Sequence, residues 1–177
     1  LEMTPSFWKS KSVFLTGHTG FKGGWLAHWL TQLGANVYGY SLEPSSESNF
    51  FTETKLTERL TDSTIGDVRD LKNLSAAMKK SNADIVFHMA AQPLVRESYN
   101  FPVDTFATNV MGTVNLLEAA RQSDRIRGIV NIITDKCYEN KEWLWSYRES
   151  DRLGGHDPYS ASKACAELVA SSYRKSF

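Results

Sequence analysis

The sequence has little cysteine and no excess of charge of either sign. Its 177 residues include two cysteines, Cys137 and Cys165, which are too few for a disulfide scaffold and are not spaced as metal ligands. We therefore expect no metal site and a reducing compartment, the cytoplasm. Lysine plus arginine and aspartate plus glutamate both number 20, so the charge gives no reason to expect a nucleic acid or an anionic membrane as a partner.

Long apolar runs are missing as well. No uninterrupted apolar run approaches the ~20 residues that span a bilayer, and the first residues, LEMTPSFWKS, lack the apolar stretch of a signal peptide. Apolar residues make up 41% and charged residues 23%, which is ordinary for a globular domain and argues against disorder. The length fits one domain, which we place at residues 1–177.

What the sequence does contain is a regular alternation of short strands and amphipathic helices. Apolar runs predict strands at residues 13–16, 36–41, 85–89 and 129–133. Two of the predicted helices carry apolar faces made of Leu26, Trp29, Leu30 and Leu33, and of Phe106, Val110, Val114 and Leu117. Asp70 and Asp157 are expected to cap two further helices. Residues 41–65 show no clear pattern.

This alternation predicts an α/β fold of the Rossmann type, a doubly wound parallel sheet with helices on both faces. Such a sheet normally has six or more strands, and no strand candidate follows the helix expected at residues 158–173. We therefore expect the chain to be a partial dinucleotide-binding domain that stops before the last strands and a C-terminal substrate domain.

A glycine-rich loop, TGHTGFKG at residues 16–23, lies between the first strand and the first helix. Gly17 can take the tight turn, Gly20 can let the backbone approach a pyrophosphate, and Gly23 can allow the helix to pack closely on the strand. The N–H groups of the helix start can bind phosphate. The expected cofactor-binding residues here are Gly17, Thr19, Gly20, Phe21, Lys22 and Gly23, and the His18 ring could touch a phosphate. A glycine-rich turn without a ligand remains the alternative.

Two further clusters carry groups suited to catalysis. Tyr159 and Lys163 are four residues apart and project from one helix face, so that the ammonium could lower the pKa of the phenol and make it a usable base. Lys163 could also hydrogen-bond the nicotinamide ribose, so both residues are expected at the cofactor. Residues 134–136, Thr-Asp-Lys, close the strand at residues 129–133, at the sheet edge where ligands of α/β folds bind. A solvated helix face and a strand-end turn are the structural alternatives.

The glycine spacing G-x-x-G-x-x-G at residues 17–23 and the motif Y-x-x-x-K at residues 159–163 resemble those of the extended short-chain dehydrogenase/reductase family. The likeness covers residues 8–177. The segment GDVRD at 66–70 is similar to the family's adenine-binding stretch, which implies cofactor contacts for Asp67 and Val68. The segment HMAAQ at 88–92 is similar to the loop after the family's fourth strand. It implies contacts for Ala90, Ala91 and Gln92, and Thr108 matches a further cofactor position. A turn, simple packing and helix filling are the respective alternatives.

The second predicted strand bears on the choice of dinucleotide. It ends Tyr40-Ser41-Leu42-Glu43, with Ser41 where an acidic residue would bind the adenosine ribose of NAD. No arginine follows that could pair with a 2′-phosphate, and Glu43 would repel one. We therefore expect NAD as the cofactor, bound rather weakly.

Residues 134–140, TDKCYEN, narrow the resemblance to the nucleotide-sugar 4,6-dehydratases, most closely those acting on CDP-glucose. The resemblance implies that Thr134 contacts the sugar 4-OH, Asp135 protonates the leaving 6-OH and Tyr159 takes the 4-OH proton. Lys136 stands where the family has a glutamate that removes the C5 proton. An ammonium cannot accept a proton, so Lys136 must be neutral, relay through another group or stabilise an enolate.

The resemblance also implies the product and the assembly. The product would be CDP-4-dehydro-6-deoxy-D-glucose, which makes the protein a lyase that supplies deoxysugars for bacterial surface polysaccharides such as O-antigen. A homodimer or homotetramer is expected through the helices near 102–122 and 158–175. A sugar epimerase or dehydrogenase and a non-catalytic dinucleotide-binding module are the alternatives. Trp143, Trp145 and Tyr147 could stack on a sugar or base, or seal a core or subunit contact.

Overall fold

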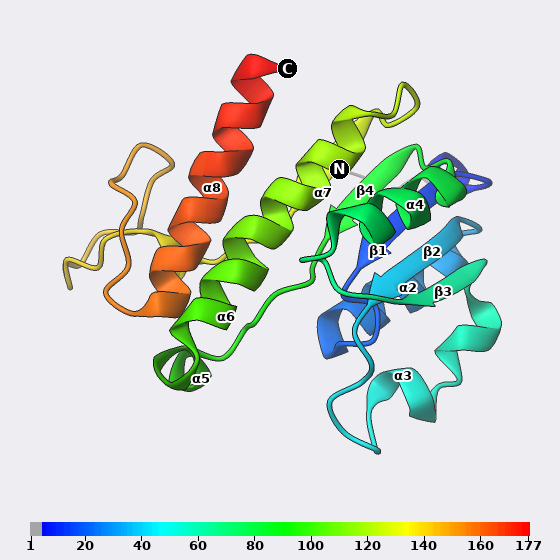
Figure 1. Cartoon of the computed structure of the whole chain (residues 1–177), viewed down its shortest axis with the longest axis horizontal. Coiled ribbons are helices and arrows are strands. Elements are labelled where there is room, and N and C mark those ends of the chain that lie inside the picture. The colour runs from blue at the N-terminus through cyan, green and yellow to red at the C-terminus, as the bar shows by residue number, and fades with distance from the viewer. Residues whose placement is uncertain (1–4) are drawn as a thin grey trace.

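Five parallel strands form the framework of the chain in a computed structural model, which describes residues 5–177 (Figure 1). The strands are β1 (Ser12–Thr16), β2 (Asn36–Ser41), β3 (Asp62–Ile65), β4 (Ile85–His88) and β5 (Gly128–Asn131). Their order in the sheet is β3-β2-β1-β4-β5, and every pairing is parallel. The order reverses between β1 and β4, and ligands of doubly wound sheets bind beyond the carboxyl ends of the strands at such a point.

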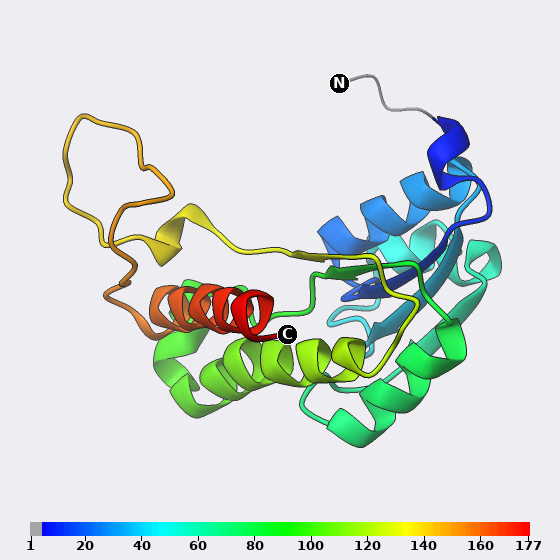
Figure 2. The same ribbon diagram turned by 90° about the horizontal axis from the view of Figure 1, so that it is seen from above.

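Helices cover both faces of this sheet, as the view from above shows (Figure 2). They are α1 (Pro5–Trp8), α2 (Phe21–Gln32), α3 (Phe50–Glu53), η1 (Leu56–Arg59), α4 (Leu71–Ser81), α5 (Val95–Asn100), α6 (Pro102–Phe106), η2 (Ala107–Met111), α7 (Gly112–Arg121), η3 (Asp135–Cys137) and α8 (Pro158–Ser176). One core cluster joins α2, α3 and η1 to the sheet, and a second joins α4 and α7 to its other face. The helix α8 packs beside α6 and α7.

The predicted α/β fold class is confirmed, and the four predicted strands correspond to β1, β2, β4 and β5 within two residues at their ends. Asp70 and Asp157 cap α4 and α8 by accepting hydrogen bonds from the N–H groups of Asn73 and Ser160. The strand β3 lies in the stretch that showed no pattern. It is a half-exposed edge strand of sequence DSTI, so it lacks the apolar signal of a buried strand.

The predicted buried face of α2 was wrong in part. The buried residues of α2 are Gly23, Gly24, Ala27 and Leu30, whereas the Trp29 side chain is 52% exposed. Gly23 lies against the backbone of Gly17 and Gly24 lies against the Phe50 side chain, so the start of α2 packs on the glycine loop and on α3. Of the four, only Ala27 and Leu30 join the core cluster of the sheet.

The predicted apolar stripe of the later helix was also wrong in part. A π-helical turn, η2, interrupts the segment, and Phe106 is 38% exposed. The polar residues Thr105, Asn109 and Thr113 are buried instead. They can be buried because each has hydrogen-bond partners inside the protein.

Three further observations concern the part of the chain that the structure describes. None of its helices combines the length and the apolarity needed to traverse a bilayer. It holds no group of three or more His, Cys, Asp or Glu residues placed to bind a metal ion. Cys137 is buried, Cys165 is half-buried, and both are free.

Candidate active site

The glycine loop after β1 folds tightly against a second loop, the one that follows β4. Gly17 has a φ of +78°, and a Cβ added there would lie 2.8 Å from the backbone nitrogen of Ala90. A Cβ at Gly23 would overlap the carbonyl oxygen of Gly17. Both positions therefore require glycine for reasons internal to the chain.

Gly20 differs from these two glycines. It is exposed, its φ is −77°, and a Cβ there would meet only the Gly17 carbonyl oxygen, at 3.4 Å. Gly20 is also the N-cap of α2 and supplies no capping side chain to the first turn, which begins with the exposed Phe21 and Lys22. An open approach to uncapped N–H groups at the start of a twelve-residue helix fits a phosphate group.

Thr19 and His18 turn inward from the same loop. The Thr19 hydroxyl donates to the backbone oxygen of Leu42 at 2.8 Å and lies 2.8 Å from the Ser41 hydroxyl, which joins the glycine loop to the end of β2. The expectation that the His18 ring could touch a phosphate was wrong. The ring is fully buried with Nε2 2.8 Å from the Ser63 hydroxyl, and burial lowers its pKa to about 4.

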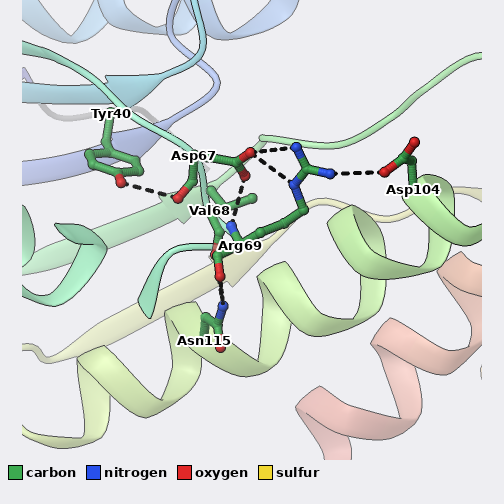
Figure 3. A network of polar contacts seen from close by, with 6 residues as sticks. All are labelled: Tyr40, Asp67, Val68, Arg69, Asp104 and Asn115. Atoms are coloured by element: carbon green, nitrogen blue, oxygen red, sulfur yellow. Dashed lines mark hydrogen bonds and ion pairs between the residues drawn. The ribbon is translucent and has the colours of Figure 1, made fainter. Parts of the chain in front are cut away.

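The segment at residues 67–69 is held from three sides (Figure 3). The Asp67 carboxylate accepts hydrogen bonds from the backbone N–H and the guanidinium of Arg69, which also contacts Asp104 on α6 at 3.0 Å. The Tyr40 hydroxyl donates to the Asp67 backbone oxygen, and the Asn115 amide donates to the Val68 and Arg69 oxygens.

Hydrogen bonding to Arg69 lowers the pKa of Asp67, so its half-buried carboxylate stays ionised and able to accept a further hydrogen bond. The Val68 side chain is buried in the core. The segment therefore presents one fixed anionic acceptor beside the second strand.

Gln92, in the loop after β4, uses its side chain inside its own loop. Its amide donates to the Leu94 backbone oxygen and to the Thr105 hydroxyl, and its carbonyl accepts from the Leu94 N–H. Ala90 and Ala91 are half-buried beside it. This side chain therefore shapes the loop.

Asn109, at 1% exposure, lies next to Thr108 at the position that resembles the family's cofactor contact, but its bridging role was not predicted from the sequence. Its side chain accepts from the Gln92 N–H at 2.8 Å and donates to the Gln92 oxygen at 3.1 Å and to the Ser162 hydroxyl at 2.8 Å. It thus connects the loop after β4 to α8. The signal available was a polar residue amid a buried helix; its neighbour Thr108 is only half-buried.

Thr134 directly precedes η3, which packs against α8, and Tyr159 lies in the first turn of α8. The Thr134 hydroxyl donates to Asp135 Oδ1 at 3.1 Å. Burial raises the pKa of the Tyr159 phenol, hydrogen bonding by the Thr134 side chain opposes this, and the Asp157 and Asp135 carboxylates raise it further. The exposed Lys136 follows on the same short helix.

Lys163 differs from expectation in what it contacts. Its amine, buried at 8% exposure, donates to the backbone oxygen of Ile132 at 3.1 Å, and burial lowers its pKa to about 8. The expected net lowering of the phenol pKa is not found, because burial raises the pKa of Tyr159 and the Lys163 amine is directed at the Ile132 oxygen. The charge of Lys163 acts instead on His88, at the end of β4.

The loop between η3 and α8 projects beyond the end of α8 (Figures 1 and 2). Trp143 and Trp145 are 44% and 73% exposed, whereas Tyr147 stacks on Tyr138 with ring centroids 5.2 Å apart. A cavity of about 230 Å³ is formed by residues of η3, the loop and the start of α8. It is lined in part by Asp135, Lys136, Tyr138, Tyr147 and His156.

The glycine loop, the end of β4 and residues 134–136 lie at the same edge of the sheet. Thr16, the last residue of β1, is 2.8 Å from the ring of His88 at the end of β4, and His88 in turn lies within electrostatic range of Lys163 on α8. The glycine loop follows Thr16 directly, and Thr134 follows β5 closely. A ligand lying along this edge could reach both the helix N-terminus of α2 and the first turn of α8.

Comparison of the sequence with known proteins finds relatives among the nucleotide-sugar 4,6-dehydratases. A family model described as GDP-mannose 4,6 dehydratase matches residues 14–177. A CDP-glucose 4,6-dehydratase of Salmonella typhimurium is 55% identical over 172 residues, which cover 97% of this chain and 48% of that protein. The chain therefore spans about half the length of this curated relative.

Solved structures share the fold. The UDP-glucose 4-epimerase of Brucella ovis in complex with NAD matches with a TM-score of 0.81 at 26% identity, over 95% of this chain and 49% of that one. MoeE5 in complex with UDP-glucose and NAD matches with a TM-score of 0.74 at 29% identity, over 92% of this chain and 48% of that one.

Proposed function

Since the chain belongs to the GDP-mannose 4,6-dehydratase family, we propose that it is the NAD-binding part of a nucleotide-sugar 4,6-dehydratase that acts on CDP-glucose. The observation that carries the proposal is that η3, which holds Asp135 directly after Thr134, packs against α8, which holds Tyr159, at the sheet edge that also bears the glycine loop. The 55% identity to a CDP-glucose 4,6-dehydratase supports the choice of substrate.

The residues along this edge suit NAD. The uncapped start of α2 and the open backbone at Gly20 would hold the pyrophosphate. The Asp67 carboxylate would accept from the adenine amino group, and the loop of Ala90 and Ala91 would lie against the nicotinamide end. When bound, NAD would supply the acceptor for the C4 hydride, whose loss makes the C5 proton acidic, and the donor of the same hydride to C6 once water has left, so that the C4 ketone remains in the product.

NAD is favoured over NADP by the end of β2. The Ser41 hydroxyl there is already 2.8 Å from the Thr19 hydroxyl, so it makes a weak partner for the adenosine ribose. Glu43, which is exposed, would repel a 2′-phosphate. We therefore expect measurable but modest affinity for NAD and less for NADP.

The chain's own side chains would move the protons. Tyr159 would take the proton of the sugar 4-OH in its phenolate form, with the Thr134 hydroxyl to orient that group. Burial raises the pKa of the phenol in the chain alone, so the positive charge of a bound nicotinamide would have to lower it. Asp135 would give a proton to the 6-OH as it leaves as water. Lys136 would face the C5 proton as a neutral amine, or stabilise the enolate that its loss creates.

Oligomerisation is also part of the proposal. Val103, Phe106 and Met111 on the helical segment at 102–121 and Leu168 on α8 are between 38% and 80% exposed. These two neighbouring elements would pair with the same elements of a second copy and cover their apolar side chains.

The test is to incubate the protein that carries this chain with CDP-, dTDP- and GDP-hexoses and to follow an alkali-sensitive 4-keto product. We expect CDP-glucose to be converted fastest, with loss of one water by mass spectrometry. A product that keeps the oxygen at C6 would support a 4-epimerase, the activity named for the Brucella ovis relative. Absence of turnover with every sugar would favour a non-catalytic dinucleotide-binding module.

A further inference from the structure

A buried histidine lies between the two loops proposed to hold the cofactor. His88 ends β4 and is 3% exposed. Its Nδ1 lies 2.8 Å from the Thr16 hydroxyl at the end of β1, and its Nε2 lies 3.2 Å from the Thr113 hydroxyl on α7. The proton transfers proposed above do not use this imidazole.

The surroundings of Thr16 determine which ring nitrogen carries the proton. The Thr16 oxygen accepts hydrogen bonds from the N–H groups of Met89 and Ala90, both at 3.1 Å. A hydroxyl has two lone pairs and one proton. With both lone pairs engaged, Thr16 can only donate to His88, so Nδ1 must be an unprotonated acceptor.

The other side of the ring agrees with this assignment. The Thr113 hydroxyl donates to the backbone oxygen of Asn109 at 2.7 Å, which leaves a lone pair for the Nε2–H of His88. A second proton on Nδ1 would displace Met89 or Ala90 from Thr16. Burial, together with the positive charge of Lys163, lowers the pKa of His88 to about 3, so the ring stays neutral.

We propose that His88, as the neutral tautomer with its proton on Nε2, is a positioning residue that fixes the glycine loop against the loop at residues 89–92. By accepting the Thr16 proton it leaves both lone pairs of that hydroxyl to Met89 and Ala90. The second loop is thereby held where Gly17 packs on it, with space for no Cβ. This proposal depends on the proposed function only in taking NAD as the ligand that the two loops hold.

The wild-type chain gives the first test. Proton–nitrogen NMR of the chain labelled with ¹⁵N-histidine should show His88 with one protonated nitrogen, Nε2, and one bare nitrogen. The signals should not change between about pH 5 and about pH 8, where ordinary histidines titrate. A proton on Nδ1, or titration of His88 in that range, would overturn the proposal.

Variants give the second test. His88→Phe keeps a ring but loses both hydrogen bonds, Thr113→Val removes the acceptor of Nε2–H, and Thr113→Ser keeps it. In the first two, the Ala90 amide should exchange roughly tenfold faster or more, and NAD should bind about tenfold more weakly. Thr113→Ser should stay near wild type in both respects.

If His88→Phe folds and its Ala90 amide exchanges at the wild-type rate, the proposal is overturned. If that variant does not fold, the tautomer of His88 in wild type is the test. A wild-type chain that fails to bind NAD would instead refute the proposed function. The tautomer and the Ala90 exchange would still show whether His88 positions the loop.

Discussion

The ε-amine of Lys163 donates a hydrogen bond of 3.1 Å to the backbone carbonyl oxygen of Ile132. This contact joins α8 to the segment that follows β5, two residues before Thr134. The same position removes the amine from water, and burial lowers its pKa to about 8. The residue therefore links the geometry of the site to the pH dependence of the fold.

Because of Lys163, the free energy of unfolding should rise with pH above about 8. The unfolded lysine keeps its proton up to about pH 10.5, whereas the folded one releases it near 8, so the unfolded chain binds more protons between these values. The full difference corresponds to about 3 kcal/mol. Urea unfolding at pH 7 and pH 10.5 should therefore show the free energy of unfolding of wild type rising relative to that of Lys163→Met, a comparison that cancels the opposite effect of groups with a raised pKa such as Tyr159.

Lys136→Met is the matched control, because it removes a lysine that is exposed on the nearby η3. It should keep the wild-type rise of stability with pH. If wild type and Lys163→Met differ by the same free energy at both pH values, the buried amine does not titrate as described.

Two glycines of the same loop should differ in how much stability an alanine costs. Gly23→Ala puts a Cβ onto the Gly17 carbonyl oxygen and should cost about 2 kcal/mol or more of stability. Gly20→Ala meets that oxygen only at 3.4 Å and should cost less than about 1 kcal/mol. Urea titration measures both.

NAD titration of the same variants separates the fold from the ligand. Gly20→Ala should fold and yet bind NAD about tenfold or more weakly, because the new methyl group occupies the open side of the loop. Wild-type NAD affinity in Gly20→Ala would place the pyrophosphate elsewhere.

The sequence predicted the strands that are apolar throughout, and the structure shows why it did no better elsewhere. A run such as Val13–Thr16 is buried on both sides, so its composition alone reports a central strand. The strand β3 pairs with β2 alone and is half-exposed, so its residues need not be apolar. The face of α2 was misjudged because two of its four buried residues are glycines, which hydrophobic periodicity does not count.

For the candidate site, sequence spacing placed Tyr159 and Lys163 on one helix but could not show their partners. The partner of Lys163 is a backbone oxygen after β5, which only the packing of α8 determines. The same holds for Asn109, whose partners Gln92 and Ser162 are 17 and 53 residues away in the chain. A long-range hydrogen bond leaves no periodic trace in a sequence.

Asn109→Leu should destabilise the chain by roughly 2 to 3 kcal/mol. The substitution leaves the N–H and oxygen of Gln92 and the hydroxyl of Ser162 without their partner in a buried place. Thr108→Ala, at the adjacent half-buried position, should change stability by less than about 0.5 kcal/mol. Chemical unfolding measures the loss of stability in both variants. Equal losses would show that Asn109 does not bridge the loop after β4 and α8.

Thr108→Ala also tests a cofactor contact implied by the family resemblance. If its hydroxyl contacts NAD, the variant should bind NAD several-fold more weakly although its stability is nearly unchanged. An unaltered dissociation constant for NAD would show that the Thr108 hydroxyl does not contact the cofactor.

Two substitutions at the sheet edge should stop the proposed reaction at different stages. Tyr159→Phe removes the group that takes the 4-OH proton, so the sugar should not be oxidised at C4. Asp135→Asn removes only the proton donor to the 6-OH, so oxidation at C4 should still occur while loss of water slows by about 10² to 10⁴. Because Asp135 is exposed and makes one side-chain hydrogen bond, with Thr134, the substitution should leave the fold intact.

The stage of arrest can be read from the absorbance of reduced nicotinamide after CDP-glucose is added to the NAD-loaded protein that carries this chain. We expect the absorbance to persist in Asp135→Asn, to stay absent in Tyr159→Phe and to be transient in wild type. The order of the steps explains the contrast, since elimination at C6 needs the C4 ketone and the ketone needs the phenol. Rapid product formation by Asp135→Asn would assign the acid at C6 to another group, whereas reduction of NAD in Tyr159→Phe would remove the phenol from its role as the base.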